Sequence, residues 1–287
     1  MARVAHILWA QARRIVLTVL LGGLIGATMV RVAPGFNTDE RDVVTGLSRE
    51  SHEAARAERQ ADSNIARFYL SFLKSLFTGD LGVSRSFNRP VAELLRERLP
   101  ETAVSITYGI AGGMLLGLLL ALGTVFWRTP SSDIAADVST GLLLSIPAAV
   151  LGLAFLWTGA NGKWAIALLV TPHVYRYSKN LLLSALNSPH VLAARARGIS
   201  KSRLIFAHVV TPVAPHLIAL CGMSLTIAFS ASIPVEVVCD TPGIGQLVWK
   251  SALGRDLPLL VSITMLVALT VLIVNAIGDM FIEWCTR

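Results

Sequence analysis

The residues of this chain that could carry out chemistry are few, and they form no recognisable catalytic set. A phosphate-binding loop needs the pattern Gly-x-x-x-x-Gly-Lys-Ser/Thr, and the segment Gly162-Lys163-Trp164 lacks both its spacing and its hydroxyl. The metalloprotease pattern His-Glu-x-x-His and the hydrolase pattern Gly-x-Ser-x-Gly are also missing. We therefore expect that the chain is not an enzyme and that it binds no ATP through a loop of its own.

Histidines and cysteines could hold a metal ion, but their spacing does not favour one. His190, His208 and His216 have no carboxylate at ligand spacing, so satisfied or surface histidines are the better interpretation. The cysteines are widely separated and odd in number, which gives no disulfide framework. They are Cys221, Cys239 and Cys285. We expect no metal site and no cofactor.

One polar segment, residues 187–203, has the local signals of a short helix. Ser188 can serve as an N-cap, and Pro189 suits the first helical position. Gly198 can end the helix in a left-handed conformation. We therefore predict a helix near residues 188–200 that joins two apolar stretches of the chain.

This predicted helix has the composition of a protein-docking element. The 187–203 segment contains four basic residues and no acidic residue. Val191 and Leu192 offer apolar anchors, while Arg195 and Arg197 can pair with acidic groups on a partner. The alternative is that the arginines only anchor the segment against anionic lipid.

The elements that position this segment are expected to be membrane helices. The chain has 287 residues and is 54% hydrophobic and only 15% charged, whereas an average protein is about 25% charged. Its apolar runs approach the ~20 residues that one membrane crossing needs. We predict six crossings, at about residues 15–33, 104–127, 138–157, 164–186, 213–238 and 259–282. The fold class is therefore all-α and polytopic; for residues 15–33 a cleaved signal peptide is the alternative.

The distribution of charge predicts the orientation in the membrane. Basic residues without acidic ones collect in residues 1–14 and 176–203, while residues 36–103 carry ten basic and eleven acidic residues. Because basic segments stay in the cytoplasm, the net charge of +7 indicates topology and not nucleic-acid binding. We expect both termini and the 187–203 segment to be cytoplasmic.

The same pattern divides the chain into three parts. We predict an N-terminus with a first membrane helix at 1–35, an extracytoplasmic polar segment at 36–103, and a transmembrane core at 104–287.

Three features of the core predict its packing. Glycines recur every fourth residue on one face of the 104–127 span, which permits a close approach of another helix; they are Gly109, Gly113 and Gly117. Pro147 predicts a kink within the 138–157 span. Arg176 and Lys179 lie at the inner end of the 164–186 span, from which they can reach the lipid headgroups.

Three segments of the chain form recognisable sequence motifs. The first is Thr78-Gly79-Asp80-Leu81-Gly82-Val83-Ser84, followed by Arg89-Pro90-Val91 and Leu99-Pro100-Glu101-Thr102. The second is Ala193-Ala194-Arg195-Ala196-Arg197-Gly198-Ile199-Ser200, with His208 beyond it. The third is Glu236, then Thr241-Pro242-Gly243-Ile244-Gly245-Gln246-Leu247 and Arg255-Asp256-Leu257-Pro258. In their order and spacing, which extend over nearly the whole chain, these segments resemble the inner-membrane permease subunits of dipeptide and oligopeptide ABC importers.

The resemblance implies a type I importer permease fold in a bacterial inner membrane. The 188–200 helix then corresponds to the family's cytoplasmic EAA loop, which docks on an ATPase subunit. Its coupling residues are Val191, Leu192, Ala193, Ala194, Arg195, Arg197 and Gly198. The implied partners are a second permease, two ATPase subunits and an extracytoplasmic solute-binding protein, and the implied cargo is a peptide or a related small solute.

The third segment resembles the family's outward loop between its last two helices. Its candidate residues for a gate or a binding-protein contact are Glu236, Pro242, Gly243 and Gly245. For the glycines, a plain turn is the alternative. For Glu236, polar packing at a helix end is the alternative to contact with the solute.

The sequence also departs from the family pattern. Leu192 stands where the EAA consensus has glutamate, the 158–163 connection is short, and the charged stretch 39–67 matches no family segment. These departures motivate a second hypothesis, in which the chain is a degenerate permease that serves as a scaffold or accessory subunit of another membrane complex.

Overall fold

The computed structural model describes residues 79–127 and 129–285, together with a few isolated positions nearer the N-terminus. These residues belong to two compact units. The first unit contains residues up to 98 together with 247–270, and the second contains 99–246 and 271–287. Apart from a few isolated positions, the predicted 15–33 span lies outside the described residues, as does the whole of the charged 39–67 stretch.

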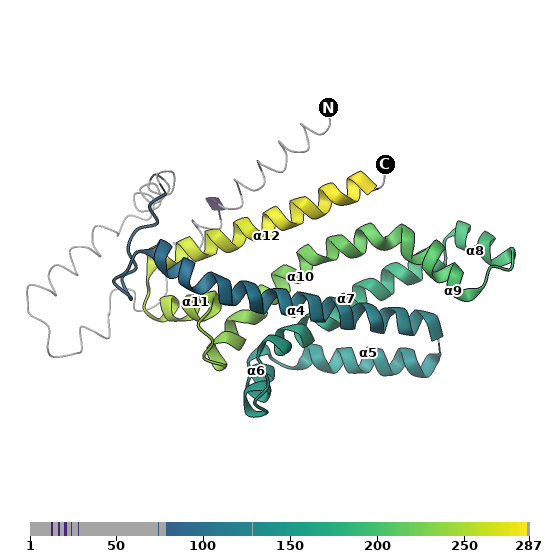
Figure 1. The fold of residues 1–287 in the computed structure, drawn as a ribbon, viewed down its shortest axis with the longest axis horizontal. Helices are drawn as coiled ribbons and strands as arrows, with labels where there is room; N and C mark the ends of the chain where they lie inside the picture. The colour runs from purple at the N-terminus through teal and green to yellow at the C-terminus, as the bar shows by residue number, and fades with distance from the viewer. Residues whose placement is uncertain are drawn as a thin grey trace, which may run out of the picture. The chain divides into compact units, whose positions relative to one another are not determined.

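The described chain is helical, as predicted (Figure 1). Its main helices are α4 (Val91–Trp127), α5 (Pro130–Ser145), α6 (Ala148–Trp157), α7 (Lys163–Leu186), α8 (Pro189–Ala196), α10 (Thr211–Val238), α11 (Ile244–Leu253) and α12 (Leu257–Cys285). Between α8 and α10 lie the short α9 (Lys201–Arg203) and the π-helix η2 (Leu204–Val210).

Three helical stretches of the described residues are long and apolar enough to cross a membrane, and a bent pair of helices raises the number to four. The three are Val91–Trp127, Lys201–Val238 and Leu257–Phe281. They contain the predicted second and fifth crossings and all but the last residue of the sixth, and the bent pair contains the third. The predicted fourth crossing forms α7, a helix of 24 residues that is less apolar than these.

Helix α7 tolerates its polar residues because the second unit surrounds it. Ten of its residues are buried, and it contacts α5, α6 and α10. Pro172 and Tyr175 are among the buried ones. A helix that lies inside a bundle meets protein instead of lipid, so its hydropathy underestimates its burial.

The glycine stripe on α4 packs directly on α7, as predicted. A Cβ atom added to Gly113 would lie 2.6 Å from Cβ of Val170 and 3.0 Å from the Ala167 carbonyl oxygen. One added to Gly117 would lie 2.7 Å from Cβ of Val174. Only a residue without a side chain allows the two helices to approach this closely.

The chain does change direction at Pro147, but the prediction of one kinked helix is wrong, because two separate helices meet there. Helix α5 ends at Ser145, α6 begins at Ala148, and the two axes differ by 94°. Ile146, the residue before the proline, has extended dihedrals with ψ of 121°. Proline disfavours helical dihedrals in the residue that precedes it, so the helix stops here instead of bending.

Two predicted boundaries also differ from the structure. Residues 91–98 and the 104–127 span form the one continuous helix α4, which accommodates Pro100 within it. Residues 201–212, which lie between the predicted helix near 188–200 and the predicted 213–238 crossing, are helical and continue α10 toward its N-terminus. A seven-residue π-helical stretch, η2, accommodates this join.

Candidate functional site

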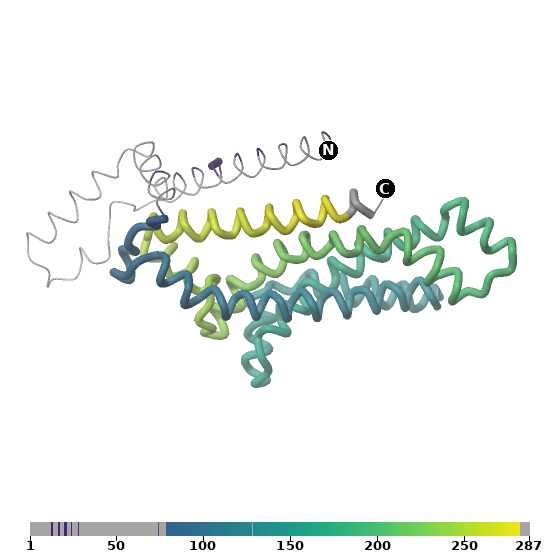
Figure 2. The backbone as a smooth tube through the Cα atoms, turned by 45° about the horizontal axis from the view of Figure 1, so that its top comes forward, coloured from purple at the N-terminus to yellow at the C-terminus, as the bar shows by residue number. Residues whose placement is uncertain are grey.

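Helix α8 lies at the end of the second unit where α7 finishes and the chain returns toward α10, on the side where α4 turns into α5 (Figures 1 and 2). Pro189 occupies the first helical position and Gly198 has φ of +75°, both as predicted. Ser188 occupies the N-cap position, but its hydroxyl donates to the Ala185 carbonyl oxygen at 2.5 Å. The prediction that its side chain caps α8 is therefore wrong.

One face of α8 is anchored in its own protein. Val191 is 1% exposed and Ala194 is 5% exposed, and both belong to a cluster with residues of α4, α7 and η2. His190 adds a polar contact, because its Nε2 lies 3.2 Å from the carbonyl oxygen of His208. Val191 is thus not an external anchor, contrary to the prediction.

The other face of α8 is open. Leu192 is 52% exposed, and Ala193, Arg195, Arg197 and Gly198 are exposed as well. Among the described residues, no acidic side chain pairs with Arg195 or Arg197. The structure therefore presents one apolar side chain and two guanidinium groups on a helix whose opposite face is fixed.

Glu236, by contrast, lies in a buried polar cluster. It is 2% exposed, and its Oε1 accepts a hydrogen bond from the Thr102 hydroxyl at 2.8 Å. Its Oε2 accepts from the backbone N–H groups of Gly245 at 2.7 Å and of Gln246 at 3.3 Å. The Thr102 oxygen also accepts from the N–H of Ile244 at 2.6 Å. We call these residues the Glu236 clamp.

The clamp holds the first turn of α11. The N–H groups of a helix's first turn have no partner within the helix, and a carboxylate there is favoured by the helix dipole. Glu236 and Thr102 supply acceptors for three of these groups. Of the two interpretations of Glu236 that the sequence left open, its burial and contacts favour polar packing over contact with a solute.

Gly243 and Gly245 are required by the same cluster. A Cβ atom on Gly243 would collide with the carboxylate of Glu236, and one on Gly245 would lie 2.7 Å from Cα of Ile233. Both glycines are buried, whereas Pro242 is exposed. Of the four outward-loop candidates, only Pro242 is accessible to a soluble partner.

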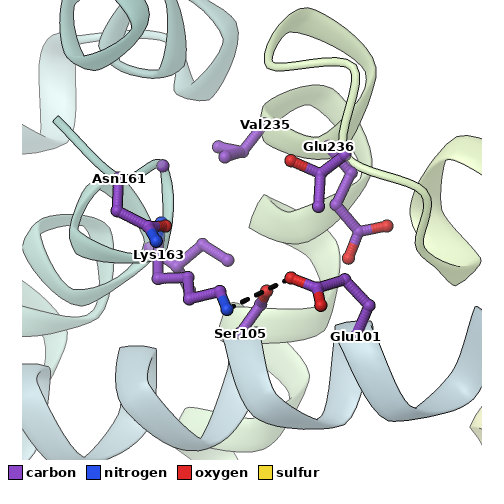
Figure 3. A pocket seen from close by; sticks show the side chains of 9 residues that line it. Glu101, Ser105, Asn161, Lys163, Val235 and Glu236 are labelled. Carbon is purple, nitrogen blue, oxygen red and sulfur yellow. Dashed lines mark hydrogen bonds and ion pairs between the residues drawn. The ribbon is translucent and has the colours of Figure 1, made fainter. Parts of the chain in front are cut away.

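Beside the clamp lies a polar cavity of about 130 Å³. Figure 3 shows Lys163 extending toward Glu101 across its floor, and Nζ of Lys163 is 3.1 Å from Oε1 of Glu101. Ser105, Asn161 and Glu236 also line it. Sequence reasoning considered Lys163 only as part of a phosphate loop and missed this ion pair, because nothing in the sequence links residues 101 and 163.

A second buried carboxylate organises the first unit. Asp256 is fully buried, and its Oδ2 accepts from the Ser84 hydroxyl at 2.5 Å and from the N–H of Ser86 at 3.0 Å. Its Oδ1 caps α12 by accepting from the N–H of Leu259 at 3.2 Å. The segments 78–84 and 255–258, which carried part of the family resemblance, therefore meet through one hydrogen-bonded pair.

Arg89, in the same unit, holds the start of α4. Its guanidinium is 2.6 Å from Glu93 and 3.0 Å from Glu97. The hydrogen bond and the charge of Glu93 raise the pKa of Arg89 above its usual value. All three side chains are solvent-exposed, so the two ion pairs add little stability.

A third polar group connects α5 to α7. Nζ of Lys179 is 2.9 Å from Oδ1 of Asp137, which also accepts from the Tyr175 hydroxyl at 2.9 Å. Asp133 lies 3.7 Å from the same ammonium. Lys179 therefore pairs within the protein, so the prediction that it reaches the lipid headgroups is wrong; Arg176 is exposed.

Comparison with known proteins gives a consistent result. Residues 113–287 match the family model described as "Binding-protein-dependent transport system inner membrane component". A candidate peptide permease of Brucella ovis is 25% identical over 91% of this chain and 92% of its own length. The glutathione transport system permease GsiC of Pectobacterium atrosepticum is 24% identical over 92% and 90%. The dipeptide permease DppB of Lactococcus lactis is 24% identical over 92% of each chain.

Proposed function

Because this chain belongs to the family of binding-protein-dependent transport system inner membrane components, we propose that it forms half of the translocation pathway of a peptide importer. It is a permease subunit of an ABC importer and not an enzyme. It is a multi-pass protein of the inner membrane that works with ATPase and binding-protein partners.

The exposed face of α8 has the size and chemistry of a docking surface for an ATPase subunit. Eight residues of helix are about 12 Å long, which suits a groove on a globular partner. Leu192 supplies apolar contact, and Arg195 and Arg197 supply charge for acidic groups at the rim of that groove. We therefore assign α8 as the element that docks on an ATPase subunit.

The buried face of α8 supports a mechanical role. Val191 and Ala194 pack with Leu182 of α7 and with Leu204 and Val209 of η2. A force applied to α8 is therefore transmitted to both α7 and the η2–α10 helix. Since packed helices move as nearly rigid bodies, closure of the ATPases would tilt these helices and change access to the pathway.

Peptide cargo is proposed from the relatives, whose names specify peptide, dipeptide and glutathione transport. Glutathione is itself a small peptide, so these names share one chemical class. We propose a complex of this chain, a second permease, two ATPase subunits and an extracytoplasmic solute-binding protein. In this arrangement α8 and both termini lie in the cytoplasm, and the Glu236 clamp and Pro242 lie at the outer end.

Charge reversal on α8 tests the proposal. In Arg195→Glu/Arg197→Glu the folded permease should retain its paired permease but lose ATPase subunits on copurification. Binding-protein-stimulated ATP hydrolysis should fall about tenfold or more, since charges across an interface contribute strongly to specific association. The matched control is Arg96→Glu, which reverses the charge of an exposed side chain on α4.

Two outcomes would count against the proposal. If the double variant copurifies with as much ATPase as wild type and Arg96→Glu, α8 does not dock on the ATPase. If the wild-type protein forms a stable complex without any ATPase subunit, the scaffold hypothesis replaces the transport one. Uptake of peptides by the wild-type complex in liposomes tests the cargo separately.

A further inference from the structure

The second unit contains an open hollow of about 350 Å³. It is lined by Leu143, Leu144, Ala148, Leu169, His173, Thr226, Ile227, Ser230 and Ala231. These residues come from α5, α6, α7 and α10. No charged residue is among them, and their polar groups are two hydroxyls and one imidazole.

The two hydroxyls differ from most others in these helices. Thr226 and Ser230 lie one turn apart on α10, both are exposed, and among the described residues neither hydroxyl has a hydrogen-bond partner. Many other helical hydroxyls donate to a carbonyl oxygen three or four residues earlier in the same helix. Examples are Thr107 to Ala103 at 2.7 Å, Thr171 to Ala167 at 2.8 Å and Thr270 to Leu266 at 2.8 Å. The hydroxyls of Thr226 and Ser230 are therefore available to a ligand.

The imidazole adds an acceptor. Nδ1 of His173 lies 3.1 Å from the carbonyl oxygen of Leu169. A carbonyl oxygen only accepts, so Nδ1 carries the hydrogen in this contact. In the neutral ring Nε2 is then an acceptor, and no hydrogen bond occupies it among the described residues. The hollow thus combines two groups that donate or accept with one that accepts.

Lipid is a poor neighbour for this surface. A polar group without a partner in hydrocarbon costs several kcal/mol, and three such groups surround one hollow. The apolar residues of the lining equally disfavour a bulk-water channel for ions. An occupant that has both amide groups and apolar groups can form hydrogen bonds with the polar part of the lining and pack against the apolar part.

We propose that this hollow is a cargo-contact site of the translocation pathway that binds the main chain of an extended peptide and one uncharged side chain. The hydroxyls of residues one helical turn apart are separated by about 6 Å along the axis. Successive N–H groups on one side of an extended peptide are separated by about 6.6 Å. Thr226 and Ser230 can therefore bind two successive main-chain groups, while Leu143, Ala148 and Ile227 surround the side chain.

The absence of charge predicts selectivity within peptides. A charged side chain placed in this hollow would lose part of its hydration and find no opposite charge in the lining. We therefore expect small peptides with apolar or uncharged side chains to pass more readily than those with a central lysine or glutamate. This inference rests on the proposed peptide transport.

The test uses the whole importer, with both permeases, the ATPases and the binding protein, in liposomes. Uptake of Ala-Ala-Ala, Leu-Leu-Leu, Ala-Lys-Ala and Ala-Glu-Ala is measured for wild type, Thr226→Val/Ser230→Ala and Ser230→Asp. The control is Thr107→Val, which removes an exposed hydroxyl bonded within its own helix. Because the binding protein is the same throughout, changes in selectivity come from the permease.

The double variant should lower kcat/KM for Ala-Ala-Ala about tenfold through two lost hydrogen bonds, with no loss for Thr107→Val. Ser230→Asp should raise the uptake ratio of Ala-Lys-Ala to Ala-Ala-Ala about tenfold. If the double variant matches Thr107→Val and Ser230→Asp leaves the ratio unchanged, the site is refuted while peptide transport stands. If the double variant instead loses its paired permease, the hollow is a subunit interface, which also refutes the site. If wild type takes up none of the four peptides, the proposed cargo itself is wrong.

Discussion

Replacing Thr102 by valine removes one hydroxyl from the centre of the Glu236 clamp while keeping the shape of the side chain. That hydroxyl donates to Glu236 at 2.8 Å and accepts from the N–H of Ile244 at 2.6 Å. Thr102 is 2% exposed, so bulk water does not reach it. The variant Thr102→Val therefore breaks two hydrogen bonds without opening a cavity.

The cost follows from the two partners that remain. A hydrogen bond to a charged group contributes about 1.5–3 kcal/mol, and a buried N–H left without a partner costs about 1–3 kcal/mol. The two effects overlap because the cluster relaxes, so we expect a loss of about 2–4 kcal/mol. Thr107→Val on the same helix loses only an exposed bond to the Ala103 carbonyl oxygen, which should cost under about 0.5 kcal/mol.

The assay is thermal unfolding of the purified complex, followed by binding-protein-stimulated ATP hydrolysis. Thr102→Val should unfold at a lower temperature than Thr107→Val, and Glu236→Gln should be destabilised similarly. The double variant Thr102→Val/Glu236→Gln should lose at least about 1 kcal/mol less than the sum of the single losses, because the residues share one network. Equal stability of the two threonine variants, or additive losses in the double variant, would refute the assignment of the clamp.

Three further predictions concern the packing around α7 and the end of α8. Gly113→Ala should destabilise the protein by about 1–2 kcal/mol through overpacking on α7. In the same thermal unfolding experiments the control Gly141→Ala should be neutral, because its added Cβ would meet only Arg176, at 3.6 Å. Gly198→Val should lower ATPase retention while Gly198→Asn preserves it, because the added Cβ meets no atom within 4 Å and only the positive φ disfavours valine; equal retention would contradict this. Asp137→Lys and Lys179→Asp should each lower the melting temperature, and their combination should restore it; failure of the combination would show that the pair does not join α5 to α7.

Local signals in the sequence predicted much of the fold. Pro189 and Gly198 correctly bounded α8, because each constrains the backbone where it stands. The spacing of Gly113 and Gly117 correctly predicted a close helix contact, since residues four apart share a helix face. Apolar runs predicted the long helices, although α4 begins within the polar residues 91–98 and the helical stretch that leads into α10 begins at Lys201.

Contacts between distant segments could not be predicted in this way. Nothing local indicates that Thr102 meets Glu236, that Ser84 meets Asp256, or that Lys179 pairs with Asp137. Each depends on how helices pack, which hydropathy does not specify. Even so, Glu236 and Asp256 both lie in segments that resemble the permease family. In the structure each of these carboxylates binds the N-terminal end of a helix and joins it to a distant segment.

Disulfide crosslinking from α8 to the ATPase subunit tests directly whether α8 docks there. Leu192→Cys, in a background whose native cysteines are replaced, is paired with single cysteines along a candidate groove of the ATPase subunit. The control is Val150→Cys on α6, since Val150 is 54% exposed and Leu192 is 52% exposed. Docking predicts a crosslink from residue 192 whose yield changes when ATP binds, and none from residue 150. Absence of any crosslink from residue 192 in a complex that hydrolyses ATP would contradict the account.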